Sequence, residues 1–447
     1  MKIKNICCIG AGYVGGPTMA VIALKCPDIN VTVVDMNKEK IEKWNGDLDY
    51  LPVYEPGLRE IIAQVRNKNL FFSDKIDESI QKSEMIFMAV NTPTKIEGKG
   101  AGMAADLSFV ESCAKNIALV SKNDKIVIEK STLPVRTAEK IKTILKKYNN
   151  ECHFEILSNP EFLAEGSAIE DLFKSDRVLI GGDTTTSGQK AVKALVNIYS
   201  NWIPLDKIIT TNVWSSELSK LASNAMLAQR ISSINSLSVI CEKTGANTIE
   251  VAKAVGMDHR IGSYFLSPSP GFGGSCFQKD ILNLVYLCEH YGLNEVAEFW
   301  HQVIKINNYQ RMRIVHKVEE LFKKDSKGRI TILGWAFKKN TNDSRESSSI
   351  YISNSLLNMG YKLNIYDPKV TEERILDDLN NLNKLNNNPA YTLTSDKLQI
   401  YNSLNESIKG TDVILILTEW DEFKNFESDA KIIDTRNIYN GNKYFKL

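Results

Sequence analysis

A short apolar segment that runs into three closely spaced glycines is the strongest constraint on how this chain folds. Residues 4–9 are apolar enough for a buried strand, and Gly10, Gly12 and Gly15 follow in the pattern G-x-G-x-x-G. The first glycine permits a tight turn, the second lets the backbone approach a pyrophosphate, and the third lets the following helix pack on the strand. The pattern therefore predicts a strand, a turn and a helix whose N-terminus holds phosphates.

A second strand with a terminal acid extends this prediction to a complete dinucleotide site. Residues 30–35 read NVTVVD, so Asp35 ends the strand, twenty residues after Gly15. A carboxylate at that place binds the ribose hydroxyls of NAD and repels the additional phosphate of NADP. If the glycines were only turn residues, the acid would have no explanation. We therefore expect NAD as the cofactor.

Three further apolar segments, at residues 85–90, 125–129 and 153–159, alternate with helical segments and lead into polar loops. This alternation predicts a parallel sheet, in which ligands bind beyond the carboxyl ends of the strands. Polar residues after the first two segments, such as Asn91 and Ser131, are expected to face the cofactor. The alternative is that they are ordinary turn and cap residues.

Two glutamates, Glu161 and Glu165, follow the third of these segments directly. An acid on such a loop can orient a water or accept a proton. Glutamates on loops are more commonly solvated surface residues, so the pattern alone leaves both interpretations open.

A segment without Gly or Pro, at residues 214–242, predicts one long helix that serves as a spine between two domains and between two subunits. Lys220 and Asn224 are four residues apart and share one face of it. A lysine on a helix is usually solvated, but small uncharged neighbours here make a buried ammonium the alternative.

One of the eight cysteines, Cys276, lies between a glycine-rich turn at residues 270–275 and an amphipathic helical segment. A thiol at a helix N-terminus is expected to have a lowered pKa, which favours the nucleophilic thiolate. Asp280 lies one turn further on and can handle protons or a water beside the sulfur. The alternative is a small buried hydrophobic residue, as most free cysteines are.

A second unit of alternating strands and helices begins after a polar linker at residues 323–329. Its first strand ends near Gly334 without the G-x-G-x-x-G pattern, so a second dinucleotide site is not expected. The basic, polar segment 337–347 follows that strand, where phosphates of another nucleotide would be bound. An Asn-rich segment at 380–390 predicts a surface loop.

These patterns predict an α/β fold with two Rossmann-like doubly wound parallel-sheet domains joined by a long central helix. We expect an N-terminal NAD-binding domain at residues 1–211. A central helical domain with the spine helix and the cysteine loop is expected at 212–325, and a second Rossmann-like domain at 326–447.

The composition excludes several classes of protein. The chain has 447 residues, 24% of them charged, and a formal net charge of +1, which offers no basic field for nucleic acid. No apolar run is long enough for a membrane span, and the N-terminus leads straight into a strand without a signal peptide. The scattered cysteines lack zinc-site spacing, so we expect no metal, reduced thiols and a cytoplasmic location.

Eight segments of the chain are notable when taken in order: GAGYVGGPT, VNTPT, EKSTLPV, SNPEFLAEG, SELSKLASNA, GFGGSCFQKD, ILGWAFK and DSRESSS. Together they resemble those of the UDP-glucose dehydrogenases, within the wider family of nucleotide-sugar dehydrogenases. The resemblance covers nearly the whole chain. It implies oxidation of UDP-glucose to UDP-glucuronate with two NAD and one water, with UDP-sugar bound by the C-terminal domain. The same four-electron oxidation of UDP-N-acetylmannosamine or GDP-mannose is the alternative.

The resemblance also implies a covalent route with one cofactor site used twice. The thiolate of Cys276 would capture the aldehyde after the first hydride transfer, and a second transfer would give a thioester that water hydrolyses. Lys220 and Asn224 would stabilise oxyanions, Asp280 would work with a water on proton transfer, and Glu161 would activate a water. The implied catalytic residues are Cys276, Lys220, Asp280, Asn224, Glu161 and Thr132.

The resemblance assigns two further sets of residues to ligands. Those implied for NAD are Gly10, Ala11, Gly12, Tyr13, Val14, Gly15, Asp35, Lys40, Val90, Asn91, Thr92, Pro93, Thr94, Ser131, Thr132, Leu133, Glu165, Cys276 and Arg345. Those implied for the UDP-sugar are Glu161, Phe162, Leu163, Ala164, Glu165, Lys220, Asn224, Arg260, Ser267, Pro268, Ser269, Pro270, Gly271, Phe272, Gly273, Phe337 and Lys338. Arg260 would reach in from a neighbouring subunit of a homo-oligomer, either a dimer or a higher assembly of dimers.

The chain departs from its relatives at two places. Lys40 stands where close relatives carry arginine, so the cation is kept without its planar fork. Asn437 follows Arg436 where some relatives have a second arginine that touches the sugar, so the sequence leaves the roles of Arg436 and Asn437 open. Two rival functions also stay open: an NAD-sensing scaffold without turnover, and an alcohol dehydrogenase that makes a single oxidation.

Overall fold

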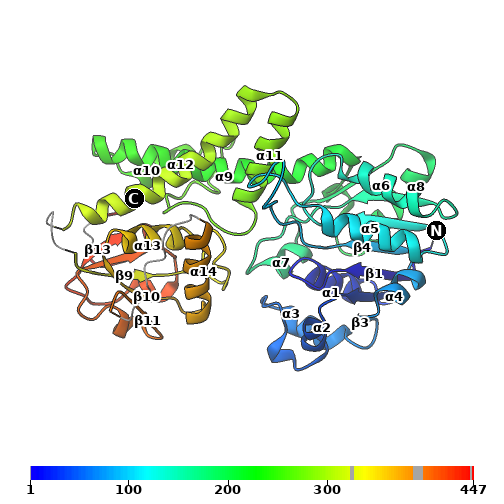
Figure 1. Cartoon of the computed structure of the whole chain (residues 1–447), viewed down its shortest axis with the longest axis horizontal. Coiled ribbons are helices and arrows are strands. Elements are labelled where there is room, and N and C mark those ends of the chain that lie inside the picture. Colours follow the sequence, from blue (N-terminus) through cyan, green and yellow to red (C-terminus); the bar gives the residue numbers. More distant parts are fainter. Residues whose placement is uncertain (1, 323–326, 386–395, 443–444, 447) are drawn as a thin grey trace. The chain divides into compact units, whose positions relative to one another are not determined.

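The computed structural model describes residues 2–322, 327–385, 396–442 and 445–446. The chain divides into two compact units, one that ends at Ser223 and one that begins at Asn224, and each contains one sheet (Figure 1). The predicted fold class is confirmed. Among the described helices, none combines the length and apolar content that a bilayer crossing requires. The described side chains also contain no cluster of His, Cys, Asp and Glu suited to a metal ion.

The first unit contains an eight-stranded sheet in the order β3-β2-β1-β4-β5-β6-β7-β8. Strands β1 to β6 are mutually parallel, as predicted, whereas β7 joins β6 in the antiparallel direction through Ser158 and Gly181. The sequence did not predict this added pair of edge strands. The strands are β1 (Asn5–Ile9), β2 (Asn30–Val34), β3 (Leu70–Ser73), β4 (Met85–Met88), β5 (Lys125–Glu129), β6 (Phe154–Ser158), β7 (Val178–Gly182) and β8 (Ile208–Asn212).

Helices cover both faces of this sheet because successive strand residues point to opposite sides. Cys8 and Val33 pack in one core with residues of α1, α3, α7 and α8, while Cys7 and Val34 pack in another with residues of α4, α5 and α6. The helices are α1 (Gly15–Lys25), α2 (Lys38–Asn45), α3 (Leu58–Val65), α4 (Ile76–Lys82), α5 (Ser108–Val120), α6 (Thr137–Tyr148), α7 (Ala168–Phe173) and α8 (Thr186–Tyr199).

The long helix predicted at residues 214–242 is confirmed as α9 (Val213–Thr244), which crosses the boundary between the units. Beyond it lie α10 (Thr248–Gly256), α11 (Phe277–His290) and α12 (Asn294–Glu319). In the described part of the chain, short 3-10 turns occur at Leu48–Tyr50, Leu205–Lys207 and Asp421–Lys424.

The second unit contains a sheet in the order β11-β10-β9-β12-β13-β14, and all of its described strand pairs are parallel. This order repeats that of β3-β2-β1-β4-β5-β6, so the predicted second Rossmann-like sheet is confirmed. The strands are β9 (Arg329–Leu333), β10 (Lys362–Tyr366), β11 (Leu398–Tyr401), β12 (Val413–Ile416), β13 (Lys431–Asp434) and β14 (Phe445–Lys446), and the helices beside them are α13 (Ser348–Asn358), α14 (Glu372–Leu385) and α15 (Leu404–Ser407).

The prediction of a surface loop at residues 380–390 is wrong for the first part of that segment, because helix α14 continues to Leu385. Ile375 and Leu379 are fully buried in the core of the second unit, and Asn383 is buried on the same helix. This tertiary packing outweighs the low helix propensity of asparagine. The rest of that segment, and residues 323–326 of the predicted linker, lie outside the described residues.

Candidate functional site

The three glycines after β1 have the geometry that a bound pyrophosphate requires. Gly10 has φ +111°, and an added Cβ would lie 2.2 Å from the Ala89 carbonyl oxygen. A Cβ on Gly15 would lie 2.0 Å from the Gly10 carbonyl oxygen, so the close approach of α1 to this turn excludes any side chain. A Cβ on Gly12 would meet nothing within 4 Å. The space beside Gly12 is therefore open for a ligand, and the residues fit NAD.

Asp35 lies just after β2 and faces this turn. Its Oδ2 accepts hydrogen bonds from Ala11 N and from Lys40 Nζ, both at 3.0 Å, and its Oδ1 accepts one from Asn37 N at 3.0 Å. Burial alone would raise the pKa of Asp35, but these hydrogen bonds hold the pKa below its ordinary value. The carboxylate is therefore ionised at neutral pH and suited to a pair of ribose hydroxyls.

The loops after β4 and β5 are tied to each other, as expected for a common rim. Thr92 Oγ1 donates to the Thr132 carbonyl oxygen at 3.2 Å, and Ser131 Oγ donates to the Val90 carbonyl oxygen at 2.6 Å. These two hydrogen bonds hold the loop that carries Thr132 against the loop after β4.

A buried group of catalytic candidates lies beyond β6. Thr132 Oγ1 donates to Glu161 Oε1 at 3.2 Å, and Lys220 Nζ lies 3.7 Å from the same oxygen. Lys220 and Glu161 are both buried, so the interpretation of either one as a solvated surface residue is wrong. Within the described chain Glu161 Oε2 has no hydrogen-bond partner although it is buried. An orphaned carboxylate oxygen of this kind is suited to a water or a substrate hydroxyl.

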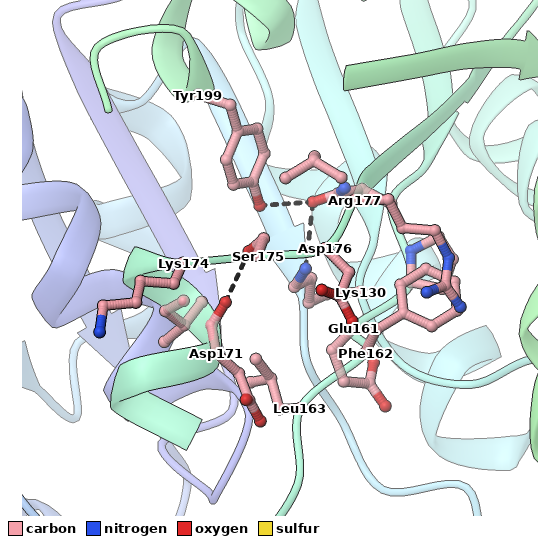
Figure 2. Close-up of a pocket in the computed structure, with 14 residues that line it drawn as sticks. Lys130, Glu161, Phe162, Leu163, Asp171, Lys174, Ser175, Asp176, Arg177 and Tyr199 are labelled. Carbon is pink, nitrogen blue, oxygen red and sulfur yellow. Dashed lines mark hydrogen bonds between the residues drawn. The ribbon is translucent and has the colours of Figure 1, made fainter. Parts of the chain in front are cut away.

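Figure 2 shows the pocket beside this group. Its walls include Glu161, Phe162 and Leu163 from the loop after β6, and the Arg177 guanidinium stacks 3.9 Å from the centre of the Phe162 ring. Lys130 also lines this pocket, although the sequence patterns did not single it out. Its place directly after a buried strand, beside Ser131, is the signal that could have identified it.

In the second unit, Cys276 is the N-cap residue of α11, as predicted. Its side chain is half-buried, and its Sγ lies 3.4 Å from Ser275 Oγ. Six other cysteines are buried, and burial raises the pKa of the Cys113 thiol to about 12. Asp280 is 1% exposed and accepts a hydrogen bond of 2.6 Å from Asn224 Nδ2. The structure therefore joins two of the predicted catalytic residues, Asp280 and Asn224, directly.

The loop before Cys276 is held by buried polar side chains that the sequence analysis missed. Asn307 on α12 accepts from Phe272 N at 2.8 Å and donates to the Phe272 carbonyl oxygen at 3.1 Å. Gln310 donates to the Ser269 carbonyl oxygen at 2.9 Å, and Arg311 to that of Phe272 at 3.0 Å. Polar residues at positions i, i+3 and i+4 on the buried face of a helix are the signal that could have identified them.

This loop also meets the segment after β9. Gly274 N donates to the Arg345 carbonyl oxygen at 2.8 Å, and a Cβ on Gly273 would lie 2.6 Å from the Glu346 carbonyl oxygen. Arg436 Nη2 donates to the Phe337 carbonyl oxygen at 3.0 Å. The structure thus brings together several residues predicted to bind the UDP-sugar, and Arg436 supports their backbone.

Other predicted ligand residues lie on the surface of the second unit. Arg260 is exposed, and its guanidinium pairs with Asp258 at 2.6 Å. Arg345 pairs with Asp343 at 2.6 Å, and Lys338 Nζ lies 5.6 Å from the centre of the Phe337 ring. Their ligand contacts stay predictions.

Three models of one protein family match successive parts of the chain. The UDP-glucose/GDP-mannose dehydrogenase family, NAD binding domain, matches residues 4–203, the central domain matches 214–309, and the UDP binding domain matches 331–441.

Individual proteins agree with this assignment. The chain is 54% identical to UDP-glucose 6-dehydrogenase 5 of Oryza sativa subsp. japonica, over 98% of this chain and 94% of that protein. It is 56% identical to UDP-glucose 6-dehydrogenase of Drosophila melanogaster, over 94% of this chain and 87% of that protein. Among solved structures, a UDP-glucose dehydrogenase from the archaeon Pyrobaculum islandicum superposes with a TM-score of 0.86 at 28% identity, over 98% and 95% of the two chains.

Proposed function

Because the chain belongs to the UDP-glucose/GDP-mannose dehydrogenase family, we propose that it oxidises UDP-glucose to UDP-glucuronate, with two NAD and one water. A plant relative and an insect relative, 54% and 56% identical over the aligned residues, carry UDP-glucose in their names, which favours this sugar over GDP-mannose and UDP-N-acetylmannosamine. The observation that carries the proposal is the buried group of Glu161, Thr132 and Lys220, in the same unit as an open dinucleotide turn.

Bound NAD supplies the hydride acceptor for both oxidations. Asp35 and the backbone around Gly12 would hold it, while Glu161 and Lys220 act on the sugar. The alcohol must lose a proton as well as a hydride, and a buried carboxylate with an orphaned oxygen is a suitable acceptor through a water. The ammonium of Lys220 stabilises the negative charge that develops on the sugar oxygen.

The second oxidation needs the aldehyde to be held in the site. We propose that the thiolate of Cys276 adds to the aldehyde carbon, so that a C–S bond forms and the carbonyl oxygen takes a proton. Loss of a hydride and that proton leaves a thioester. Attack by water then breaks the C–S bond, returns the thiolate and gives the acid. The position of Cys276 at the N-terminus of α11 supports this role, because backbone N–H groups there favour a thiolate.

Asp280 and Asn224 are proposed to manage the water of the last step. Asp280 is buried and its carboxylate is oriented by the Asn224 amide at 2.6 Å, so it can accept a proton from a water in a fixed direction. Asn224 lies one turn after Lys220 on α9. The single helix α9 therefore carries Lys220, which is proposed to stabilise the oxyanion, and Asn224, which orients the carboxylate of Asp280.

We further propose that the chain acts as a cytoplasmic homo-oligomer in which Arg260 binds the substrate of a neighbouring subunit. Exposed apolar side chains on α9, among them Met226, Leu237 and Ile240, support an association of subunits, as does the exposure of Arg260. Three domains at residues 1–211, 212–325 and 326–447 are the division that we propose for the chain.

The stoichiometry of the reaction tests the proposed function. Limiting UDP-glucose with excess NAD should give two NADH per sugar, with UDP-glucuronate as the product. A single NADH with an aldehyde product would contradict the covalent route. GDP-mannose and UDP-N-acetylmannosamine in the same assay test the alternative, and no NADH from UDP-glucose would exclude the proposed substrate.

Substitution of the thiol tests its role. Cys276→Ser should abolish the formation of UDP-glucuronate while the affinity for NAD is kept. The matched control is Cys152→Ser, because Cys152 is also half-buried but lies in the first unit beside Ser121, with its Sγ 3.6 Å from the Ser121 carbonyl oxygen. The control should retain activity, and full activity in Cys276→Ser would remove the thiolate from the mechanism.

A further inference from the structure

One arginine of α9 holds the loop that follows α10, at residues 257–265, which we call the arginine loop. The guanidinium of Arg230 donates three hydrogen bonds to the backbone of this loop. Its Nε donates to the Tyr264 carbonyl oxygen at 2.8 Å, its Nη1 to that of Ile261 at 2.9 Å, and its Nη2 to that of Gly262 at 2.7 Å. Because a guanidinium presents its donors in a rigid planar fork, these bonds fix the loop in a defined place on α9.

The backbone of the arginine loop needs such support, because part of it is strained. Phe265 has φ +61°, in the left-handed region that bulky residues rarely adopt. Directly before it lies Tyr264, whose carbonyl oxygen Arg230 binds. The loop also packs tightly on the end of α10, since a Cβ on Gly256 would lie 2.9 Å from Ser263 Cα. The arginine loop is therefore a rigid turn held by α9 and α10.

The arginine loop presents Arg260 to solvent. The side chain of Arg260 is 77% exposed, and Asp258 orients it by accepting from its Nε at 3.0 Å and from its Nη2 at 2.6 Å. These two bonds use two of the five N–H donors of a guanidinium, so the others are available to an anionic group such as a diphosphate. The direction in which Arg260 points therefore depends on the position of the loop that carries it.

Apolar side chains of the arginine loop are exposed as well. Met257 and Tyr264 are 78% and 84% exposed, and Ile261 is 44% exposed. Exposed apolar groups of this size, gathered on one turn, are typical of a surface that contacts another protein. The proposed homo-oligomer supplies such a partner, which is a second copy of this chain with its own bound UDP-sugar.

We propose that Arg230 is a positioning residue for substrate binding: it holds the arginine loop so that Arg260 reaches the UDP-glucose bound by a second copy of the chain. The proposal rests on the proposed function, because that function assigns Arg260 to the substrate of a neighbouring subunit. It adds the residue that determines where Arg260 lies. Each active site then depends on the Arg230 of the neighbouring chain, so the loss of this side chain in one subunit weakens substrate binding in the other.

The first test is Arg230→Met, which removes the three donors and keeps an unbranched side chain. We expect KM for UDP-glucose to rise about tenfold, because the charge-assisted hydrogen bonds from Arg260 to the diphosphate are weakened. Since the reacting groups are unaltered, kcat and KM for NAD should change less than about twofold. Arg260→Ala, which removes the guanidinium itself, should raise KM for UDP-glucose at least as much. A raised KM in Arg260→Ala with an unchanged KM in Arg230→Met would overturn the proposal.

Mixed oligomers show in which chain Arg230 acts. Arg230→Met is co-expressed with Cys276→Ser, and oligomers that contain both chains are isolated by two affinity tags. Only the Arg230→Met chain then has the thiol, and its neighbour has an intact arginine loop. The kinetics should contain a component with the KM of the unaltered protein, which Arg230→Met alone lacks. If Arg230 acted within its own chain, every active site would keep the raised KM, and that result would overturn the proposal.

Arg66→Met is the matched control, because Arg66 is a half-buried arginine that holds the backbone of a different turn. Its Nη1 donates to the carbonyl oxygens of Trp44 and Gly46, at the end of α2, at 2.9 and 2.8 Å. Both variants lose a guanidinium that binds backbone carbonyl oxygens, but KM for UDP-glucose should stay within about twofold of the unaltered value in Arg66→Met. A tenfold rise in this control would overturn the proposal, since the effect would then not be specific to the arginine loop.

Arg230→Lys keeps the proposal testable if Arg230→Met does not fold. Lysine keeps the positive charge, but an ammonium cannot reproduce the planar fork that reaches three carbonyl oxygens, so KM for UDP-glucose should rise at least about threefold. The KM of the unaltered protein in Arg230→Lys would overturn the proposal. Failure of the proposed function is distinguishable, because the unaltered protein would then form no NADH from UDP-glucose, or Arg260→Ala would leave KM unchanged.

Discussion

The two sheets of this chain repeat one strand order, yet only the first keeps an open turn for a dinucleotide. In the first unit the sequence Gly10-Ala11-Gly12 follows β1, and in the second Gly334-Trp335-Ala336 follows β9. Gly10 and Gly334 both have positive φ, +111° and +99°. The tight turn is therefore shared, whereas the position of the second glycine is not.

The acid after the second strand shows the same divergence. Asp35 accepts a hydrogen bond from Ala11 N, and Asp367 accepts two from Trp335 N and Ala336 N, at 2.6 and 3.0 Å. Asp367 Oδ2 also accepts from Trp420 Nε1 at 3.1 Å, and Ala336 is fully buried. Protein groups thus occupy in the second unit the place that the first leaves to a ligand. A repeated fold can therefore keep its tight turn while the space for a dinucleotide is filled.

Removal of the two acids should separate their roles, with the larger effect on stability in the second unit. Asp367→Ala removes the acceptor of five N–H donors, four of which are buried, namely Trp335 N, Ala336 N, Val370 N and Trp420 Nε1. This loss should cost about 3–5 kcal/mol of unfolding free energy. Asp35→Ala should cost about 1 kcal/mol, because two of its three donors, Asn37 N and Lys40 Nζ, lie at a partly exposed site where water can replace the carboxylate. Urea unfolding followed by tryptophan fluorescence measures both, and equal losses would contradict the comparison.

The sequence predicted these sheets well because each strand is a local apolar segment, and the order of glycines and acid around Gly12 identifies the turn. The sequence was a poor guide to side chains whose roles depend on partners far away in the chain. Lys130 donates to Asn159 and lines a pocket with Glu161, and only the fold brings these residues together. Asn307 likewise binds a loop 35 residues away, so no local pattern states its role.

A side chain in the open space beside Gly12 should weaken NAD binding without lowering the stability of the fold. A Cβ on Gly12 meets nothing within 4 Å, so Gly12→Val should unfold within about 2 °C of the unaltered protein. The added methyl groups would occupy the place of the pyrophosphate, and the Kd for NAD should rise at least about 100-fold, or about 2.7 kcal/mol. Calorimetric titration with NAD measures this change.

Gly12→Ala gives a graded version of the same test, because it places in the first unit the residue type that Ala336 provides in the second. Its loss of NAD affinity should lie between that of the unaltered protein and Gly12→Val. An unchanged Kd in both variants would show that the space beside Gly12 is not the binding place.

The smallest expected effect concerns the pH dependence of stability at Asp35. Its pKa is lower in the folded chain than the ordinary value of about 3.9, because hydrogen bonds from Asn37, Ala11 and Lys40 outweigh the opposing effect of burial. A lowered folded-state pKa means that ionised Asp35 stabilises the fold above about pH 4, and that this contribution disappears as the pH falls through the folded-state value. Asp35→Asn should therefore be less stable than the unaltered protein at pH 7, by less than about 1 kcal/mol, and urea unfolding at several pH values should show this difference shrink as the pH falls below about 4. At pH 7 Asp367→Asn should lose more stability than Asp35→Asn, because the NH₂ group of its amide cannot accept the buried N–H groups that the carboxylate of Asp367 accepts, and unfolding by urea compares the two variants.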